Sequence, residues 1–141
     1  MKDKLKLILL VDDNKDDNFF HKKAIEKADA AEEVAECVNG LDALDFLLNR
    51  GNYEGIGKSY PRPDLIFLDI NMPKMNGWEF LEEYEKLSDD TKGGPVVVML
   101  TTSVNPRDRE KMKKFRITKD FLSKPLTESD VRKIVEEYIV K

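Results

Sequence analysis

Residues 6–14 read Lys-Leu-Ile-Leu-Leu-Val-Asp-Asp-Asn, and they give the clearest indication of the fold class. Lys6–Val11 is an almost uninterrupted apolar run, and two acids, Asp12 and Asp13, follow it at once. A short continuous apolar run is typical of a strand that is buried on both faces of a parallel sheet. Open sheets of this kind bind their ligands beyond the carboxyl ends of their strands, where the two acids stand.

The rest of the chain repeats this pattern, because short apolar runs alternate with amphipathic stretches. Further strands are predicted over Glu33–Val38, Asp64–Asp69, Val96–Leu100 and Asp120–Ser123. Helices are predicted over Asn14–Ala30, Leu41–Leu48, Asn76–Lys86, Pro106–Phe115 and from Thr127 onward. Such alternation predicts an α/β fold in which helices cover both faces of a parallel sheet through right-handed crossovers.

Two helices carry more detailed signals. In the first, the apolar residues Phe20, Ala24, Ile25 and Ala28 are predicted to form one buried face. In the last, Thr127 and Asp130 have the spacing of a capping box. The apolar residues that follow it recur at helical spacing, and they are Val131, Ile134, Val135, Tyr138 and Ile139.

Composition narrows the class of protein. The 141 residues carry a net charge of −4, which makes nucleic acid and anionic membranes poor default partners. Cys37 is the single cysteine, so no internal disulfide forms and the chain fits a reducing cytoplasm. No apolar run approaches the ~18 residues of a membrane span. We expect one cytoplasmic domain over residues 1–141, with a core from about 5 to 138 and no output domain.

The residues at the predicted strand ends suggest chemistry. Asp12 and Asp13 follow the first strand, Asp69 ends the third, Thr101 follows the fourth and Lys124 the fifth. Two like charges 4 Å apart repel by about 4 kcal/mol at an effective dielectric of 20, so three clustered carboxylates call for a cation. Oxygen ligands suit Mg²⁺, while lysine and threonine side chains bind phosphate oxygens. An aspartate in such a site is a plausible phosphoryl acceptor.

Four motifs stand in order at these strand ends. They are Val11–Asn14, Leu68–Pro73 with Gly77, Met99–Thr101, and Phe121–Pro125. Together they closely resemble the receiver domain of two-component response regulators, from about Leu5 to Tyr138. The resemblance implies a flavodoxin-like (βα)5 fold with a doubly wound sheet of strand order 2-1-3-4-5.

The resemblance also implies a role for each site residue. Asp69 would accept a phosphoryl group from a phosphohistidine on a sensor histidine kinase or a phosphotransfer protein. Asp12, Asp13 and Asp69 would bind Mg²⁺ together with the backbone carbonyl of Asn71, and Lys124 would bridge to the phosphate. Such a protein is a signalling protein that catalyses its own phosphorylation and dephosphorylation, rather than an enzyme acting on a separate substrate.

A second group of residues would respond to the phosphoryl group. Thr101 would move toward it, and Phe121 would rotate inward to follow. That movement would change the surface formed by the helix over Pro106–Phe115, the strand over Asp120–Ser123 and the last helix. Asn71 and Ser103 flank the site at positions that tune hydrolysis in similar receivers.

The sequence departs from the common receiver pattern in two places. Thr102 stands where a small residue is usual, so its extra bulk would restrict access to the phosphoryl group. Arg116–Lys119 replaces the usual Gly-Ala turn before the fifth strand, which leaves the shape of that turn open.

Several functional alternatives remain at this stage. The chain is a terminal signalling module, a mid-relay phosphate carrier or a phosphorylation-independent scaffold. Its downstream protein is unknown, and it would act as a monomer or as a phosphorylation-linked homodimer. A haloacid-dehalogenase-type phosphatase is less favoured, because Asn71 replaces the acid–base carboxylate. A flavin-binding protein would need a hydroxyl- and glycine-rich loop in place of Asp12 and Asp13. A calcium loop is excluded by Asp17 and Lys23, which stand where Gly and Glu are required.

Other conspicuous residues have simpler interpretations. His21 is predicted to be a surface residue of the first helix, and Cys37 a small core residue. The helix over Pro106–Phe115 is rich in Lys and Arg, which indicates either a solvated face or a surface for partner docking. Arg50–Arg62 is predicted to be a surface loop at the edge opposite the site.

Overall fold

The computed structural model describes residues 4–48, 63–87, 96–102, 105–115 and 117–139. The predicted Arg50–Arg62 loop lies outside these described residues, and so do Ser103 and Arg116. Within the described ranges, no helix is both long and apolar enough to cross a membrane.

Five parallel strands form one sheet in the order β2-β1-β3-β4-β5. Their bounds are β1 Leu5–Val11, β2 Ala31–Cys37, β3 Leu65–Asp69, β4 Val96–Thr101 and β5 Thr118–Ser123. The predicted α/β fold and strand order are confirmed. The central strands β1, β3 and β4 are buried almost throughout, as their continuous apolar sequences require.

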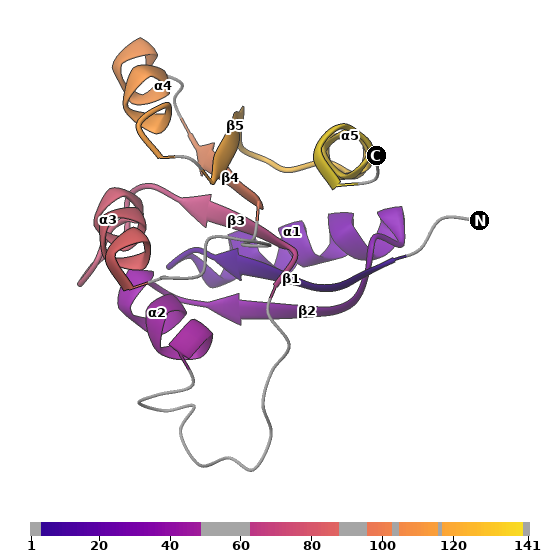
Figure 1. Cartoon of the computed structure of the whole chain (residues 1–141). Helices are drawn as coiled ribbons and strands as arrows, with labels where there is room; N and C mark the ends of the chain where they lie inside the picture. Colours follow the sequence, from indigo (N-terminus) through magenta and orange to yellow (C-terminus); the bar gives the residue numbers. More distant parts are fainter. Residues whose placement is uncertain (1–3, 49–62, 88–95, 103–104, 116, 140–141) are drawn as a thin grey trace.

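Helices cover both faces of this sheet (Figure 1). Their bounds are α1 Lys15–Ala28, α2 Gly40–Leu48, α3 Gly77–Leu87, α4 Pro106–Met112 and α5 Glu128–Ile134, and a short π-helix, η2, follows over Val135–Ile139. Helices α2 and α3 lie on one side, and α1 and α5 lie together on the other (Figure 1). The sheet is therefore doubly wound, with its strand carboxyl ends left uncovered for a site.

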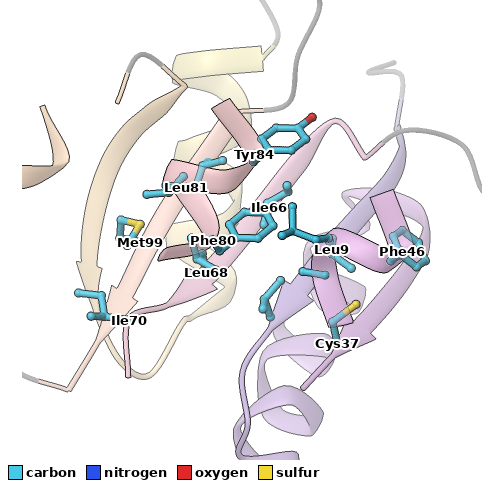
Figure 2. Close-up of a cluster of buried hydrophobic side chains, with 14 of the residues drawn as sticks. Leu9, Cys37, Phe46, Ile66, Leu68, Ile70, Phe80, Leu81, Tyr84 and Met99 are labelled. Atoms are coloured by element: carbon cyan, nitrogen blue, oxygen red, sulfur yellow. The ribbon is translucent and has the colours of Figure 1, made fainter. Parts of the chain in front are cut away.

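The core consists of two clusters, one on each face of the sheet. Leu7 and Leu9 of β1 point into the cluster under α2 and α3, while Ile8 and Leu10 point into the cluster under α1 and α5. Figure 2 shows the first cluster, in which Phe80 of α3 packs among strand side chains. Each fully buried Leu, Ile or Phe contributes about 1.5–3 kcal/mol through the hydrophobic effect, so this alternation fixes both helical layers.

Side-chain caps set where the helices begin. The side chain of Asn14 accepts hydrogen bonds from the backbone N–H groups of Asp16 and Asp17, so α1 begins one residue after the predicted start. At α5, Thr127 and Asp130 bond each other's backbone reciprocally, which confirms the predicted capping box.

The predicted buried face of α1 is partly wrong. Phe20 is 62% exposed, whereas His21, predicted to be on the surface, is only 2% exposed. The buried face of α1 consists of Asn18, His21, Ala24, Ile25 and Ala28. Phe20 precedes His21 by one residue, which turns it about 100° around the helix and out of the core. Burial lowers the pKa of His21, and the nearby Lys124 adds to this, against the opposing charges of Asp12 and Asp17.

Two other boundaries differ from the prediction. Helix α4 ends at Met112 instead of Phe115, and β5 begins at Thr118 instead of Asp120. The Thr118 hydroxyl donates to the carbonyls of Met112 and Phe115, at 2.7 Å in each case. The same two carbonyls also accept from the backbone N–H groups of Phe115 and of Thr118 itself, so Thr118 ties the end of α4 to the start of β5. At β2, the strand begins at Ala31 rather than Glu33 and ends at Cys37, which is fully buried as predicted.

Gly77 is required where β3 turns into α3. Its backbone N–H donates to the carbonyl of Ile70 at 2.8 Å. A Cβ at this position would lie 2.6 Å from the carbonyl oxygen of Asp69 and 3.1 Å from the Cα of Ile70. Because these neighbours are backbone atoms, a side chain at residue 77 forces the strand end and the helix apart.

We therefore expect Gly77→Ala to lower the free energy of unfolding by about 1–3 kcal/mol, the usual cost of overpacking. Urea unfolding followed by circular dichroism measures this, with Glu82→Ala on the exposed face of α3 as a control that should change stability by no more than about 0.5 kcal/mol. A Gly77→Ala variant as stable as the wild type would contradict the close approach of β3 and α3.

Candidate functional site

The strand ends place the predicted site residues along one edge of the sheet. Register pairs Val11 with Leu68 and Thr101 with Ser123, so the residues that follow these strands share that edge. The backbone N–H of Lys124 donates to the carbonyl of Thr101 at 2.7 Å, which fixes the start of the segment after β5.

Three carboxylates meet at this edge. Carboxylate oxygens of Asp12, Asp13 and Asp69 all lie within 4.8 Å of one another. Asp12 and Asp69 are buried, while Asp13 is exposed. Asp12 is held on two sides, because its Oδ1 accepts from the backbone N–H of Asn14 at 2.9 Å and its carbonyl accepts from the Asn18 amide at 3.0 Å.

The ammonium group of Lys124 lies among these acids. Its Nζ donates to Asp12 Oδ2 at 2.7 Å and to Asp17 Oδ2 at 2.9 Å, and it lies 3.3 Å from Asp69 Oδ1. The lysine side chain is only 11% exposed, so these charges interact with little screening by solvent. The structure thus brings together Asp12, Asp69 and Lys124 from three different strand ends.

Asp17 is a site residue that the sequence analysis did not identify. It lies in the first turn of α1 rather than at a strand end, and it contributes a fourth carboxylate to this edge. Its contact with Lys124 depends on how α1 lies against the sheet, so no local sequence pattern indicates it.

Burial and charge shift the pKa values of two groups in this cluster. Burial raises the pKa of Asp69 from 3.8 to about 6, and the Asp12 carboxylate adds to the increase while Lys124 opposes it. Burial alone would lower the pKa of Lys124, but hydrogen bonds to Asp12 and Asp17 and the charges of Asp12 and Asp69 outweigh it and raise the pKa above its ordinary value. Asp69 is therefore a carboxylate whose negative charge is poorly compensated.

The donor set fits a hard divalent cation. Asp12, Asp13 and Asp69 offer oxygen ligands only, which Mg²⁺ and Mn²⁺ accept readily. A cation there would also offset the burial and the Asp12 charge that together raise the pKa of Asp69. Asn71 lies exposed between β3 and α3, and the role of its backbone carbonyl as a further ligand stays a prediction.

Thr101 and Phe121 lie on the neighbouring strands β4 and β5, where Thr101 pairs with Ser123 and Phe121 with Met99. Thr101 is buried at the end of β4, and Thr102 after it is exposed. Phe121 is 1% exposed in β5, with the Arg109 guanidinium of α4 5.7 Å from its ring centroid. Phe121 therefore points into the core in this structure and connects it to α4.

Known proteins resemble this chain in sequence and in structure. A family model described as the response regulator receiver domain matches residues 8–136. Response regulator Rcp1 of Synechocystis sp. is 43% identical over 103 residues, which are 73% of this chain and 66% of Rcp1. The match thus spans just under two thirds of Rcp1.

Two solved structures support the likeness. The crystal structure of a two-component response regulator from Cytophaga hutchinsonii has a TM-score of 0.84 at 27% identity and covers 99% of this chain and 100% of its own. The crystal structure of the Mn(2+)-bound form of response regulator Rcp1 has a TM-score of 0.74 at 32% identity and covers 96% of both chains. The second is a protein of this kind with a bound divalent metal.

The raised pKa of Asp69 predicts a pH-dependent effect of neutralising this residue in metal-free protein. Between pH 3.8 and about 6 the folded chain binds more protons at Asp69 than the unfolded chain does, so the stability from this group is lost as pH rises through 6. Asp69→Asn should raise the free energy of unfolding by about 1–2 kcal/mol at pH 7.5, and by progressively less as pH falls toward 4.

Urea unfolding in EDTA at a series of pH values measures this difference. Glu82→Gln, which removes one exposed negative charge from α3, is the matched control and should give a small, nearly constant difference. A stabilisation by Asp69→Asn that is equally large at pH 4.5 and pH 7.5 would show that the folded state does not disfavour the charged form of Asp69.

Proposed function

Because the chain belongs to the response regulator receiver domain family of two-component signalling, we propose that Asp69 accepts a phosphoryl group from a phosphohistidine, with Mg²⁺ bound beside it. The donor is a sensor histidine kinase or a phosphotransfer protein. The observation that carries this proposal is the meeting of Asp12, Asp13 and Lys124 around the buried carboxylate of Asp69.

Phosphoryl transfer requires a nucleophile and nearby positive charge. A carboxylate oxygen of Asp69 attacks phosphorus, an O–P bond forms, and the N–P bond to the donor imidazole breaks, with its electron pair returning to the ring nitrogen. Lys124 is close enough to neutralise charge on the transferring group, since its Nζ already lies 3.3 Å from Asp69.

The other acids serve the metal in this proposal. Asp12 and Asp13, with the backbone carbonyl of Asn71, hold the cation next to Asp69. Bound Mg²⁺ supplies positive charge that offsets the phosphoryl oxygens. The side chain of Asn71 tunes hydrolysis of the phosphoryl group, as does Ser103, and Thr102 limits the access of water.

The output surface is the face formed by α4, β5 and α5. Helix α4 contributes no fully buried side chain: Met112 packs partly buried against the core, and two cation–π pairs, Arg109 over Phe121 and Lys111 over Trp78, add to this contact. An element with so little buried surface shifts at low cost. A movement of Thr101 toward the phosphoryl group, followed by Phe121, would therefore reposition α4 for an unknown downstream protein.

The proposed chemistry predicts a single phosphoryl adduct in intact-mass measurements after incubation with acetyl phosphate. The adduct should form with Mg²⁺, be absent in EDTA, and be lost by more than about 90% in Asp69→Asn, because only that carboxylate acts as nucleophile. Asp16→Asn, which removes an exposed acid of α1 outside the cluster, should keep it. An adduct of equal size in Asp69→Asn would place the acceptor elsewhere.

The proposed coupling predicts that Thr101→Ala separates phosphorylation from its structural effect. The variant should still form the adduct, while the amide chemical-shift changes in α4 and β5 on phosphorylation should fall by about half or more, because the change in population depends on the contact that Thr101 makes. Thr102→Ala, at the exposed neighbouring position, should retain them. Unchanged shifts in Thr101→Ala would rule out this route.

A further inference from the structure

Asp17 is held beside Lys124 by the start of α1. The backbone N–H of Asp17 donates to the side chain of Asn14 at 3.1 Å, and the next residue, Asn18, donates its amide to the carbonyl of Asp12 at 3.0 Å. These two bonds fix the first turn of α1 against the end of β1. The carboxylate of Asp17 thus reaches Lys124 from a backbone that is already tied to the site.

The three N–H donors of the ammonium group are unevenly shared. Asp12 and Asp17 each take a hydrogen bond, at 2.7 and 2.9 Å, while Asp69 lies at 3.3 Å. Lys124 therefore interacts more closely with Asp17 than with the proposed phosphoacceptor. A phosphoryl group on Asp69 would add negative charge and three strong acceptor oxygens, and would compete for the same ammonium.

We propose that Asp17 is a positioning residue that holds Lys124 in the unphosphorylated site and competes with the phosphoryl group on Asp69 for its ammonium. This inference rests on the proposed function of Asp69. Asp17 is thereby expected to weaken the binding of a phosphoryl group and to shorten its lifetime.

The same carboxylate has the opposite effect on a divalent cation. Lys124 lies among the carboxylates that would bind the metal, so its positive charge repels a cation there. Asp17 neutralises part of that charge and so favours metal binding. Removing the Asp17 charge should therefore weaken binding of the metal and strengthen binding of a phosphoryl group, two changes of opposite sign.

Isothermal titration calorimetry of Asp17→Asn tests this with two probes. Beryllofluoride, a phosphoryl mimic, is titrated at saturating Mg²⁺, and MgCl₂ is titrated alone. We expect the dissociation constant for beryllofluoride to fall by about three- to tenfold and that for Mg²⁺ to rise by about twofold or more, as loss of a partly exposed ion pair allows. The phosphoryl adduct should also be lost more slowly.

Asp16→Asn is the matched control. Asp16 lies in the same first turn of α1, is exposed, and among the described residues makes no ion pair with Lys124. It carries the same charge near the helix N-terminus, so general effects of charge and helix dipole are shared by both variants. Asp17→Ala should shift both constants in the same directions as Asp17→Asn, and circular dichroism verifies that each variant is folded.

The outcomes separate the two proposals. If the wild type binds beryllofluoride and Asp17→Asn binds it equally or more weakly, competition by Asp17 is refuted while the role of Asp69 stands. Weaker binding of both probes would also refute it, since that pattern indicates a merely structural role. If the wild type does not bind beryllofluoride at all, the proposed function fails and this inference fails with it.

Discussion

The Lys124 ammonium contacts the carboxylates of Asp12, Asp17 and Asp69 and offsets part of the repulsion between them. The folded state depends on this contact, because the carboxylates are held close together at one edge of the sheet. Parallel strands bring their carboxyl ends together, and here those ends carry acids, two of them buried. Repulsion between such charges is strong where water is scarce, and one lysine offsets only part of it. Burial and the remaining repulsion from Asp12 together raise the pKa of Asp69, and a divalent cation bound there would stabilise its charged form.

The surrounding structure divides into a rigid and a compliant side. Around Asp12, the cap of α1, the Asn18 amide and the buried strands fix the acids in place. Around Phe121, by contrast, α4 rests on the sheet without a buried side chain of its own. This difference suits a site that binds a charged group and transmits the effect of its binding. The fixed backbone preserves the geometry of the acids, while α4 can move at low cost.

The sequence predicts most of this architecture, for identifiable reasons. Continuous apolar runs predict buried parallel strands, and the order of polar residues after them identifies Asp12, Asp69 and Lys124 as neighbours. Helix faces are harder to predict, since a rotation of one residue exchanges Phe20 for His21 in the core. The sequence does not predict the role of Asp17, because that role depends on the orientation of α1. It does not predict the start of β5 either, because that start depends on the Thr118 hydroxyl. Long-range side-chain contacts of this kind leave no local pattern.

In the proposed function, the acids of this edge bind a divalent cation next to a phosphoryl group on Asp69. The most direct test is a crystal structure of the protein grown with Mn²⁺ and beryllofluoride, using anomalous scattering to locate the metal. We expect an anomalous peak about 2.0–2.4 Å from oxygens of Asp12, Asp13 and Asp69, with beryllofluoride on Asp69 facing Lys124. Metal bound at another position, or beryllofluoride absent from Asp69 while the three carboxylates keep only Lys124 as their counter-ion, would contradict it.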